Sequence, residues 1–78
     1  NLRRVQMTNL KRIREEKGYT QQRLAQAANV SIGSIKSYEQ GRRNINLAST
    51  EFVYRLSIVL GCRIEDLIEK ENAKEEQA

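Results

Sequence analysis

Apolar residues recur along this chain at the three- and four-residue spacing of amphipathic helices, and polar breaks divide the repeat into five segments. The segments predict helices at about 9–17, 21–28, 32–40, 47–60 and 64–68. Proline is absent and glycine is scarce, which favours helices with short connections. The pattern therefore predicts an all-α fold, a compact bundle of five short helices.

The second and third segments are the most informative part of the pattern. In the second, Leu24, Ala27 and Ala28 are expected to face inward, and in the third Ile35 must turn inward. The break between them starts at Asn29, one of the few residue types besides glycine that tolerates a left-handed backbone. Two helices joined by so tight a turn can place a helix end in the major groove of DNA.

Capping residues mark the ends of these segments. Hydroxyl side chains are favoured before a helix and left-handed glycines after it. The expected N-caps are Thr8 or Asn9, Thr20 and Ser31, and the expected ends are Gly18 and Gly61.

The inward faces of the first and fourth helices can also be read from the spacing. The expected inward residues are Leu10, Ile13 and the Lys17 stem in the first helix, and Phe52, Leu56, Val59 and Leu60 in the fourth. The segment 42–46 is polar and basic with Ile45 as its one apolar anchor, so it is expected to be a loop.

Charge is distributed unevenly. Residues 1–43 carry ten Lys or Arg against three Glu, a balance of +7, whereas residues 44–78 carry four against seven acidic residues, a balance of −3. A basic end of this kind attracts polyanions and orients a protein on nucleic acid. The alternative is that a small helical protein simply has charged, solvated faces.

Several kinds of chemistry find no support in the sequence. There is no histidine, and the single cysteine, Cys62, is expected to be a small buried hydrophobic residue. Glu15-Glu16 and Glu65-Asp66 are sequence neighbours on solvent faces rather than catalytic pairs, and no glycine-rich phosphate loop occurs. We therefore expect no enzyme activity, no metal and no cofactor.

Length and hydropathy set the expected organisation. The chain has 78 residues and no apolar run of the length that crosses a bilayer, so a single soluble cytoplasmic domain without membrane contact is expected. We place an N-terminal extension at 1–8, the domain at 9–69 and a polar tail at 70–78. Met7 looks like a natural start, so the residues before it can be foreign, and a longer parent chain remains open.

The residues also resemble a known family. Leu10 to Ala25, Asn29-Val30-Ser31, Ile35, Glu39-Gln40-Gly41 and Leu60-Gly61 follow the order and spacing of helix-turn-helix regulators of the lambda-repressor and Cro type, also called the xenobiotic-response-element class. The resemblance covers nearly all of residues 10–68. It implies a lambda-repressor-like DNA-binding domain.

The resemblance implies a set of contacts to DNA phosphates. The glutamine that opens the second helix of such proteins, here Gln21, donates to a phosphate while the helix dipole points at the backbone. Further candidates are Ser31, Ser34, Arg42 and Arg43. The alternatives are an ordinary exposed glutamine at a helix start and solvated arginines in a loop.

Base reading is expected on the exposed side of the third helix, at Ile32, Gly33, Lys36 and Ser37. The first two depart from the family's usual polar residues, since Ile32 can only touch an apolar edge such as a thymine methyl group. Lys36 suits either a guanine edge or a phosphate. A glycine such as Gly33 destabilises a helix by about 1 kcal/mol relative to alanine. Close approach of the helix backbone to DNA would explain why glycine is tolerated there, and the alternative is neutral drift of the sequence.

Two further pairs are expected to serve structure and assembly. Arg14 and Glu39 resemble the semi-buried ion pair of the family, which ties the first helix to the end of the third. Tyr54 and Ile58 form a second apolar patch on the fourth helix, suited either to a homodimer contact or to packing under the linker through Ile45 or Leu47.

The expected function is sequence-specific binding of double-stranded DNA by a transcriptional regulator, a repressor that inserts the third helix (about 32–40) into the major groove as a homodimer. The alternative is an antitoxin-like protein of the same fold, which binds a toxin and its own promoter.

Overall fold

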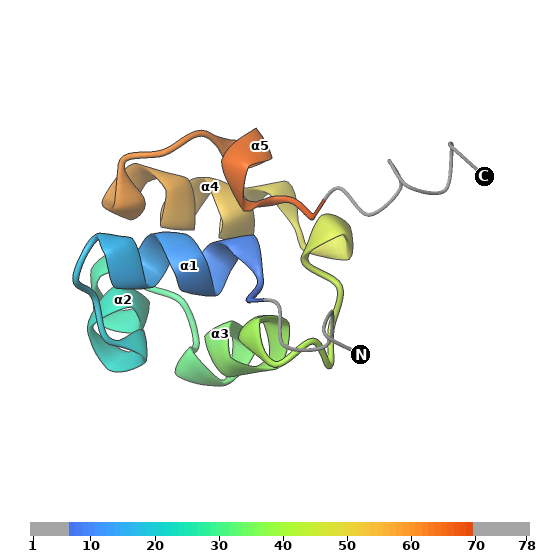
Figure 1. Cartoon of the computed structure of the whole chain (residues 1–78), viewed down its shortest axis with the longest axis horizontal. Helices are drawn as coiled ribbons and strands as arrows, with labels where there is room; N and C mark the ends of the chain where they lie inside the picture. The colour runs from blue at the N-terminus through green and yellow to red at the C-terminus, as the bar shows by residue number, and fades with distance from the viewer. Residues whose placement is uncertain (1–6, 70–78) are drawn as a thin grey trace.

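The computed structural model describes residues 7–69, and within this range it contains helices and no strands. The elements are α1 (Asn9–Glu16), α2 (Gln21–Ala28), α3 (Ile32–Glu39), the 3-10 turn η2 (Ile45–Leu47), α4 (Thr50–Leu60) and α5 (Ile64–Leu67). Figure 1 shows α2 and α3 along one side of the domain and α5 on the opposite side, with α1 and α4 between them. The all-α prediction of five short helices is confirmed. The expected tail, and the extension before residue 7, lie outside the described residues.

Serine and threonine side chains fix where the first four α-helices begin. In each case the hydroxyl of the preceding residue accepts a hydrogen bond from a backbone amide in the first turn, which satisfies a donor that the helix leaves free. These N-caps are Thr8, Thr20, Ser31 and Ser49. Of the two caps expected for α1, the structure uses Thr8, and the other two expected caps are confirmed.

Left-handed residues end two of the helices where the chain must turn sharply. Asn29 closes α2 with φ 59° and Gly61 closes α4 with φ 67°. An asparagine accepts this conformation at low cost, and a glycine has no Cβ to clash. The turn predicted at Asn29 is therefore confirmed, and it is the feature that sets α3 at an angle to α2.

All five α-helices contribute apolar side chains to one core. The largest fully buried side chains are Leu10, Leu24, Ile35, Leu56, Leu60 and Leu67. Each side chain of this kind contributes roughly 1.5–3 kcal/mol when it leaves water. Tyr38 and Ile45 extend the core beneath α3, where the Tyr38 ring lies 5.1 Å from that of Phe52.

Three details of the predicted inward faces are wrong. Ala27 is exposed, because α2 turns the face containing Leu24, Ala25 and Ala28 toward α3 and α4. Lys17 is exposed beyond the end of α1. On α4, Val53 is buried although the predicted stripe omitted it.

The start of α4 also differs from the prediction. The helix begins at Thr50 rather than near residue 47, because Ser49 caps it and residues 45–47 form a separate 3-10 turn. This turn buries Ile45, the anchor predicted for the loop, and leaves Leu47 82% exposed.

Cys62 is half-buried against the core rather than fully buried. Burial raises the pKa of its thiol, and the nearby Asp66 carboxylate raises it further. Both effects favour the neutral thiol, which is the less reactive form.

Asn46, Glu69 and Asn9 form a hydrogen-bonded group, called here the asparagine clasp, that joins the segment after α3 to both ends of the described domain. The Asn46 side chain donates to the backbone oxygen of Glu69 at 2.7 Å and accepts from its amide at 2.8 Å. The Glu69 carboxylate in turn accepts from the backbone amide of Asn9 at 2.7 Å. The clasp therefore fixes the segment that follows α3 against the start of α1.

A buried ion pair joins α1 to α3. Arg14 Nε lies 2.6 Å from Glu39 Oε2, and the two side chains are only 9% and 3% exposed. Arg14 also donates to the backbone oxygen of Tyr19 at 2.7 Å. The side-chain hydrogen bond to Glu39 raises the pKa of Arg14 above its usual value, so this cation stays charged.

Replacing Arg14 with methionine is expected to lower the free energy of unfolding by about 3–5 kcal/mol, because Glu39 is left as a buried charge without its cation. Urea denaturation followed by circular dichroism measures the loss. The matched control is Arg12→Met on the same helix, whose ion pair with Glu16 is exposed and is worth less than about 1 kcal/mol. Equal losses in the two variants would contradict the role given to the buried pair.

Candidate nucleic-acid interface

The turn between α2 and α3 is held from both sides. Within it, the amide of Val30 donates to the backbone oxygen of Ala25 at 3.0 Å. From outside, Arg55 on α4 donates to the backbone oxygen of Asn29 at 3.2 Å and is itself held by Glu51 at 2.6 Å. Because α2 has no basic residue in its last turn, Arg55 supplies the positive charge that a helix C-terminus favours.

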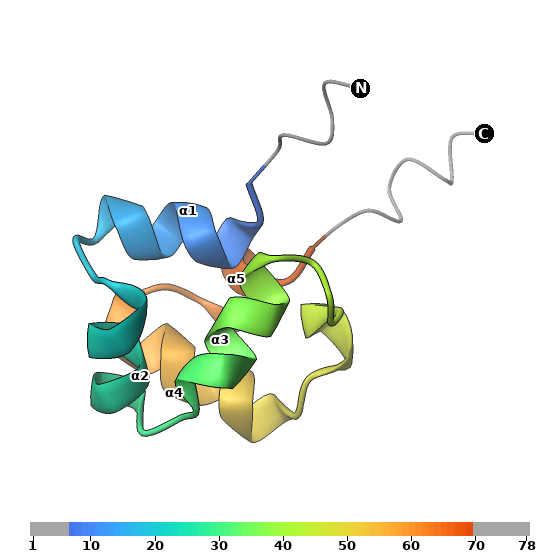
Figure 2. The ribbon, with the colours of Figure 1, turned by 90° about the horizontal axis from the view of Figure 1, so that it is seen from below.

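The helix α3 presents one face to the core and the opposite face to solvent. Figure 2 shows α3 on the near side of the domain, in front of α4 and α5 and beside α2. On its inner face, the α3 residues Ile35 and Tyr38 are buried in the core. The four residues expected to read bases lie on its outer side, with three exposed and Ser37 half-buried: Ile32, Gly33, Lys36 and Ser37.

Gly33 is not required by the fold. A Cβ atom built at this position would meet only the Ser31 hydroxyl, at 3.4 Å, which is ordinary van der Waals contact, and Gly33 is not among the glycines with positive φ. The side chain is therefore missing from the outer face of α3 although the protein itself has room for one.

The hydroxyls of the two expected phosphate-binding serines are both engaged. Ser31 accepts from the amides of Gly33 and Ser34 as the cap of α3. The Ser34 hydroxyl accepts from Arg43 at 3.5 Å.

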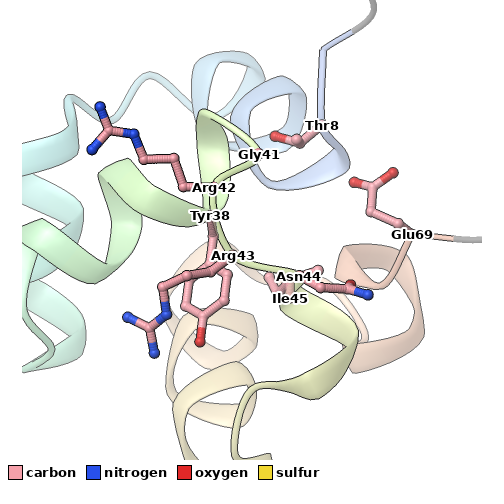
Figure 3. Close-up of a pocket in the computed structure, with 8 residues that line it drawn as sticks. All are labelled: Thr8, Tyr38, Gly41, Arg42, Arg43, Asn44, Ile45 and Glu69. Atoms are coloured by element: carbon pink, nitrogen blue, oxygen red, sulfur yellow. The ribbon is translucent and has the colours of Figure 1, made fainter.

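Arg42 and Arg43 lie in the loop directly after α3. A turn at Gly41 starts this loop, and the amide of Arg42 donates back to the Ser37 oxygen at 3.0 Å. The Arg43 guanidinium lies 4.6 Å from the centre of the Tyr38 ring, a cation–π contact. Figure 3 shows both arginine side chains extending to the side of the loop away from Glu69.

Gln21 opens α2 and is half-buried rather than freely exposed. Its side-chain amide donates to Glu39 Oε1 at 2.9 Å. The structure thus brings Gln21 together with Arg14 and Glu39 in one hydrogen-bonded group.

The charge asymmetry of the sequence is also an asymmetry in space. Exposed cations lie on α2, on α3 and in the loop after it, at Arg23, Lys36, Arg42 and Arg43. The opposite side of the domain carries α5, where the two acidic residues Glu65 and Asp66 outnumber the single exposed cation of the described residues there, Arg63. A polyanion would therefore be attracted to the α2–α3 side.

Two observations concern other kinds of site. Within residues 7–69, no group of three or more His, Cys, Asp or Glu is placed to hold a metal ion. In the same range, no helix is long and apolar enough to cross a membrane.

Comparison with protein families identifies the class of this domain. A family model described as helix-turn-helix matches residues 10–67, from the second residue of α1 to the last residue of α5. The chain belongs to this helix-turn-helix family of Cro and C1-type DNA-binding regulators. Comparisons with curated proteins and with solved structures found no match.

Two features of the interface were missed by the sequence analysis. The contact from Arg55 to the turn joins α4 to the end of α2. The sequence shows only that Glu51 and Arg55 are spaced i, i+4 for an ion pair within one helix, and this spacing does not indicate a contact with the turn. The bond from Gln21 to Glu39 likewise joins the start of α2 to the end of α3.

Replacing Gly33 with alanine is expected to raise the free energy of unfolding by about 1 kcal/mol, because alanine is the better helix former and the position has room for a methyl group. Thermal and urea denaturation measure the gain. The control is Gly61→Ala, which should destabilise the protein because Gly61 has positive φ. A loss of stability in Gly33→Ala would mean that the fold does need glycine there.

Proposed function

We propose that this protein is a sequence-specific regulator of transcription, a repressor that inserts α3 into the major groove of double-stranded DNA as a homodimer. The observation that carries the proposal is the outer face of α3, where Ile32, Gly33 and Lys36 are exposed and the cations of the following loop lie close by. A regulator of this kind acts where the DNA is, so we place it in the cytoplasm.

Contacts to phosphates from residues around α3 would hold this helix in the groove. Gln21 lies at the N-terminus of α2, where the helix dipole favours an anion. Arg42 and Arg43 lie just beyond the C-terminus of α3. Stacking on Tyr38 supports Arg43 in a fixed orientation, which lowers the entropy lost when a phosphate binds. Ser31 and Ser34 complete this group in the proposal.

Base reading would fall to Ile32, Gly33, Lys36 and Ser37. Ile32 is 36% exposed and offers an apolar contact for a thymine methyl group. The absence of a side chain at Gly33 would let the helix backbone approach the bases. Lys36 and Ser37 add hydrogen-bonding groups.

The triple variant Gln21→Ala, Arg42→Ala, Arg43→Ala is expected to bind a mixed-sequence duplex more weakly and with a shallower dependence on salt. Two cations are lost, so the slope of log K against log salt should fall by about 2. Fluorescence anisotropy of a labelled duplex at several salt concentrations gives both quantities.

The control is Arg63→Ala, which removes an exposed arginine at the start of α5, on the side of the domain away from α3. It should leave the salt slope nearly unchanged. If the wild-type protein ignores DNA at low salt, or if Arg63→Ala lowers the slope as much per charge removed as the triple variant does, the proposed phosphate contacts are wrong.

A single α3 reads only half of a typical operator, and two copies related by a twofold axis would read both halves about 34 Å apart. Tyr54 and Ile58 support such a pairing because they lie one turn apart on the outer face of α4 and are 53% and 61% exposed. The alternative, that they pack under the linker, is not supported, because Ile45 is buried in the core and Leu47 is itself exposed. Adjacent exposed apolar residues of this kind are typical of protein contacts.

The double variant Tyr54→Glu, Ile58→Glu is expected to turn a wild-type dimer into a monomer, because two carboxylates would be buried in the contact. Sedimentation or size exclusion at several protein concentrations measures the change. The control Arg23→Glu alters the net charge by the same amount on an exposed site of α2. A dimer that survives the double variant excludes this surface, and a wild-type monomer would favour a different protein partner, as in the antitoxin-like alternative.

A further inference from the structure

The carboxylate of Glu39 is shared between two partners. It accepts from Arg14 Nε at 2.6 Å and Nη2 at 3.0 Å, and from the Gln21 amide at 2.9 Å. Glu39 is the last residue of α3, Gln21 is the first residue of α2, and the Glu39 side chain is only 3% exposed. A buried charge at the end of α3 is therefore bonded directly to the side chain that opens α2.

This bond determines which way the Gln21 amide points. A glutamine amide has two N–H donors and one oxygen acceptor, and either end can turn toward a neighbour. Beside a carboxylate only the nitrogen end is favourable, because the oxygen end would be repelled. With one N–H bonded to Glu39, the second N–H is left for an outside acceptor such as a phosphate oxygen.

We propose that Glu39 is a positioning residue for the contact of Gln21 with the DNA backbone, in addition to its structural pairing with Arg14. The proposal rests on the DNA-binding function proposed above. Glu39 does not touch the phosphate. It holds the Gln21 side chain in one orientation before DNA arrives, so less conformational entropy is lost on binding.

Arg14 offsets the unfavourable burial of the Glu39 carboxylate and its repulsion of DNA phosphates. An isolated anion close to the DNA backbone would be costly to bury and would repel phosphates. The Arg14 guanidinium neutralises it and has donors bonded to Glu39 and to the Tyr19 oxygen. The pair is therefore close to neutral as seen from the DNA, while the directional bond to Gln21 is kept.

The test replaces both charges at once, in the variant Arg14→Met, Glu39→Met. The net charge is unchanged, so long-range attraction to DNA is unchanged, and a buried ion pair exchanged for apolar residues of similar size often leaves a fold intact. Binding to the duplex should weaken roughly three- to tenfold, the range expected for one poorly oriented hydrogen bond. Circular dichroism verifies that the variant is folded.

A double-mutant cycle then separates positioning from a general structural effect. In a Gln21→Ala background, the same two methionine changes should alter the affinity less than twofold, because the side chain that Glu39 positions is gone. The matched control is Arg12→Met, Glu16→Met, which removes an exposed ion pair from α1 and should leave affinity unchanged. Equal losses with and without Gln21 would overturn the proposal.

A measurement on the wild-type protein needs no variant. The side-chain amide of Gln21 should give two resolved proton signals in a nitrogen–proton NMR spectrum, one of them shifted by its bond to the carboxylate. On addition of duplex, the second signal should move and the first should stay. If the two signals are those of a free amide before DNA is added, Glu39 does not position Gln21. If the wild-type chain binds no duplex at all, the proposed function itself fails, which is a separate result.

Discussion

The rest of the domain depends on the buried pair of Arg14 and Glu39. The pair joins α1 to the end of α3, and through the hydrogen bond to Gln21 it also reaches the start of α2. In the low-dielectric interior each of these charges would be costly alone, and together they are stable because each is paired with the other and hydrogen-bonded. Within residues 7–69, no buried side-chain polar atom is left without a partner. The orientation of α2 and α3 is thus fixed by a polar group as well as by apolar packing.

The position of α3 follows from contacts on its inner face and at its two ends, so its outer face needs no support from the protein. Ile35 and Tyr38 anchor it to the core, Arg55 holds the turn before it, and the loop after it is fixed by Ile45 and the asparagine clasp. A helix that is held in this way can keep an open outer face. The empty position at Gly33, where the fold has room for a side chain, is consistent with that face serving an outside partner.

The two sides of the domain suit different partners. The α2–α3 side is basic, and the chain belongs to a helix-turn-helix family, so both observations support contact of this side with DNA. The outer face of α4 carries Tyr54 and Ile58 and is suited to contact with protein. Because α4 also packs against α2, the proposed dimer contact on its outer face would set the distance between two copies of α3.

The sequence by itself determined that five helices form, the caps of α2 and α3 and the turn at Asn29, because each depends on residues within a few positions of one another. It also determined the family, through the spacing of residues across 10–67. It did not determine the cap and start of α4. Only the tertiary structure decided that Ala27 is exposed, since a single small residue carries too weak an apolar signal to fix a helix rotation. The same holds for the bond between Gln21 and Glu39, the contact of Arg43 with Tyr38 and the hold of Arg55 on the turn. These contacts join side chains whose direction depends on how the helices pack, and local sequence does not encode that packing.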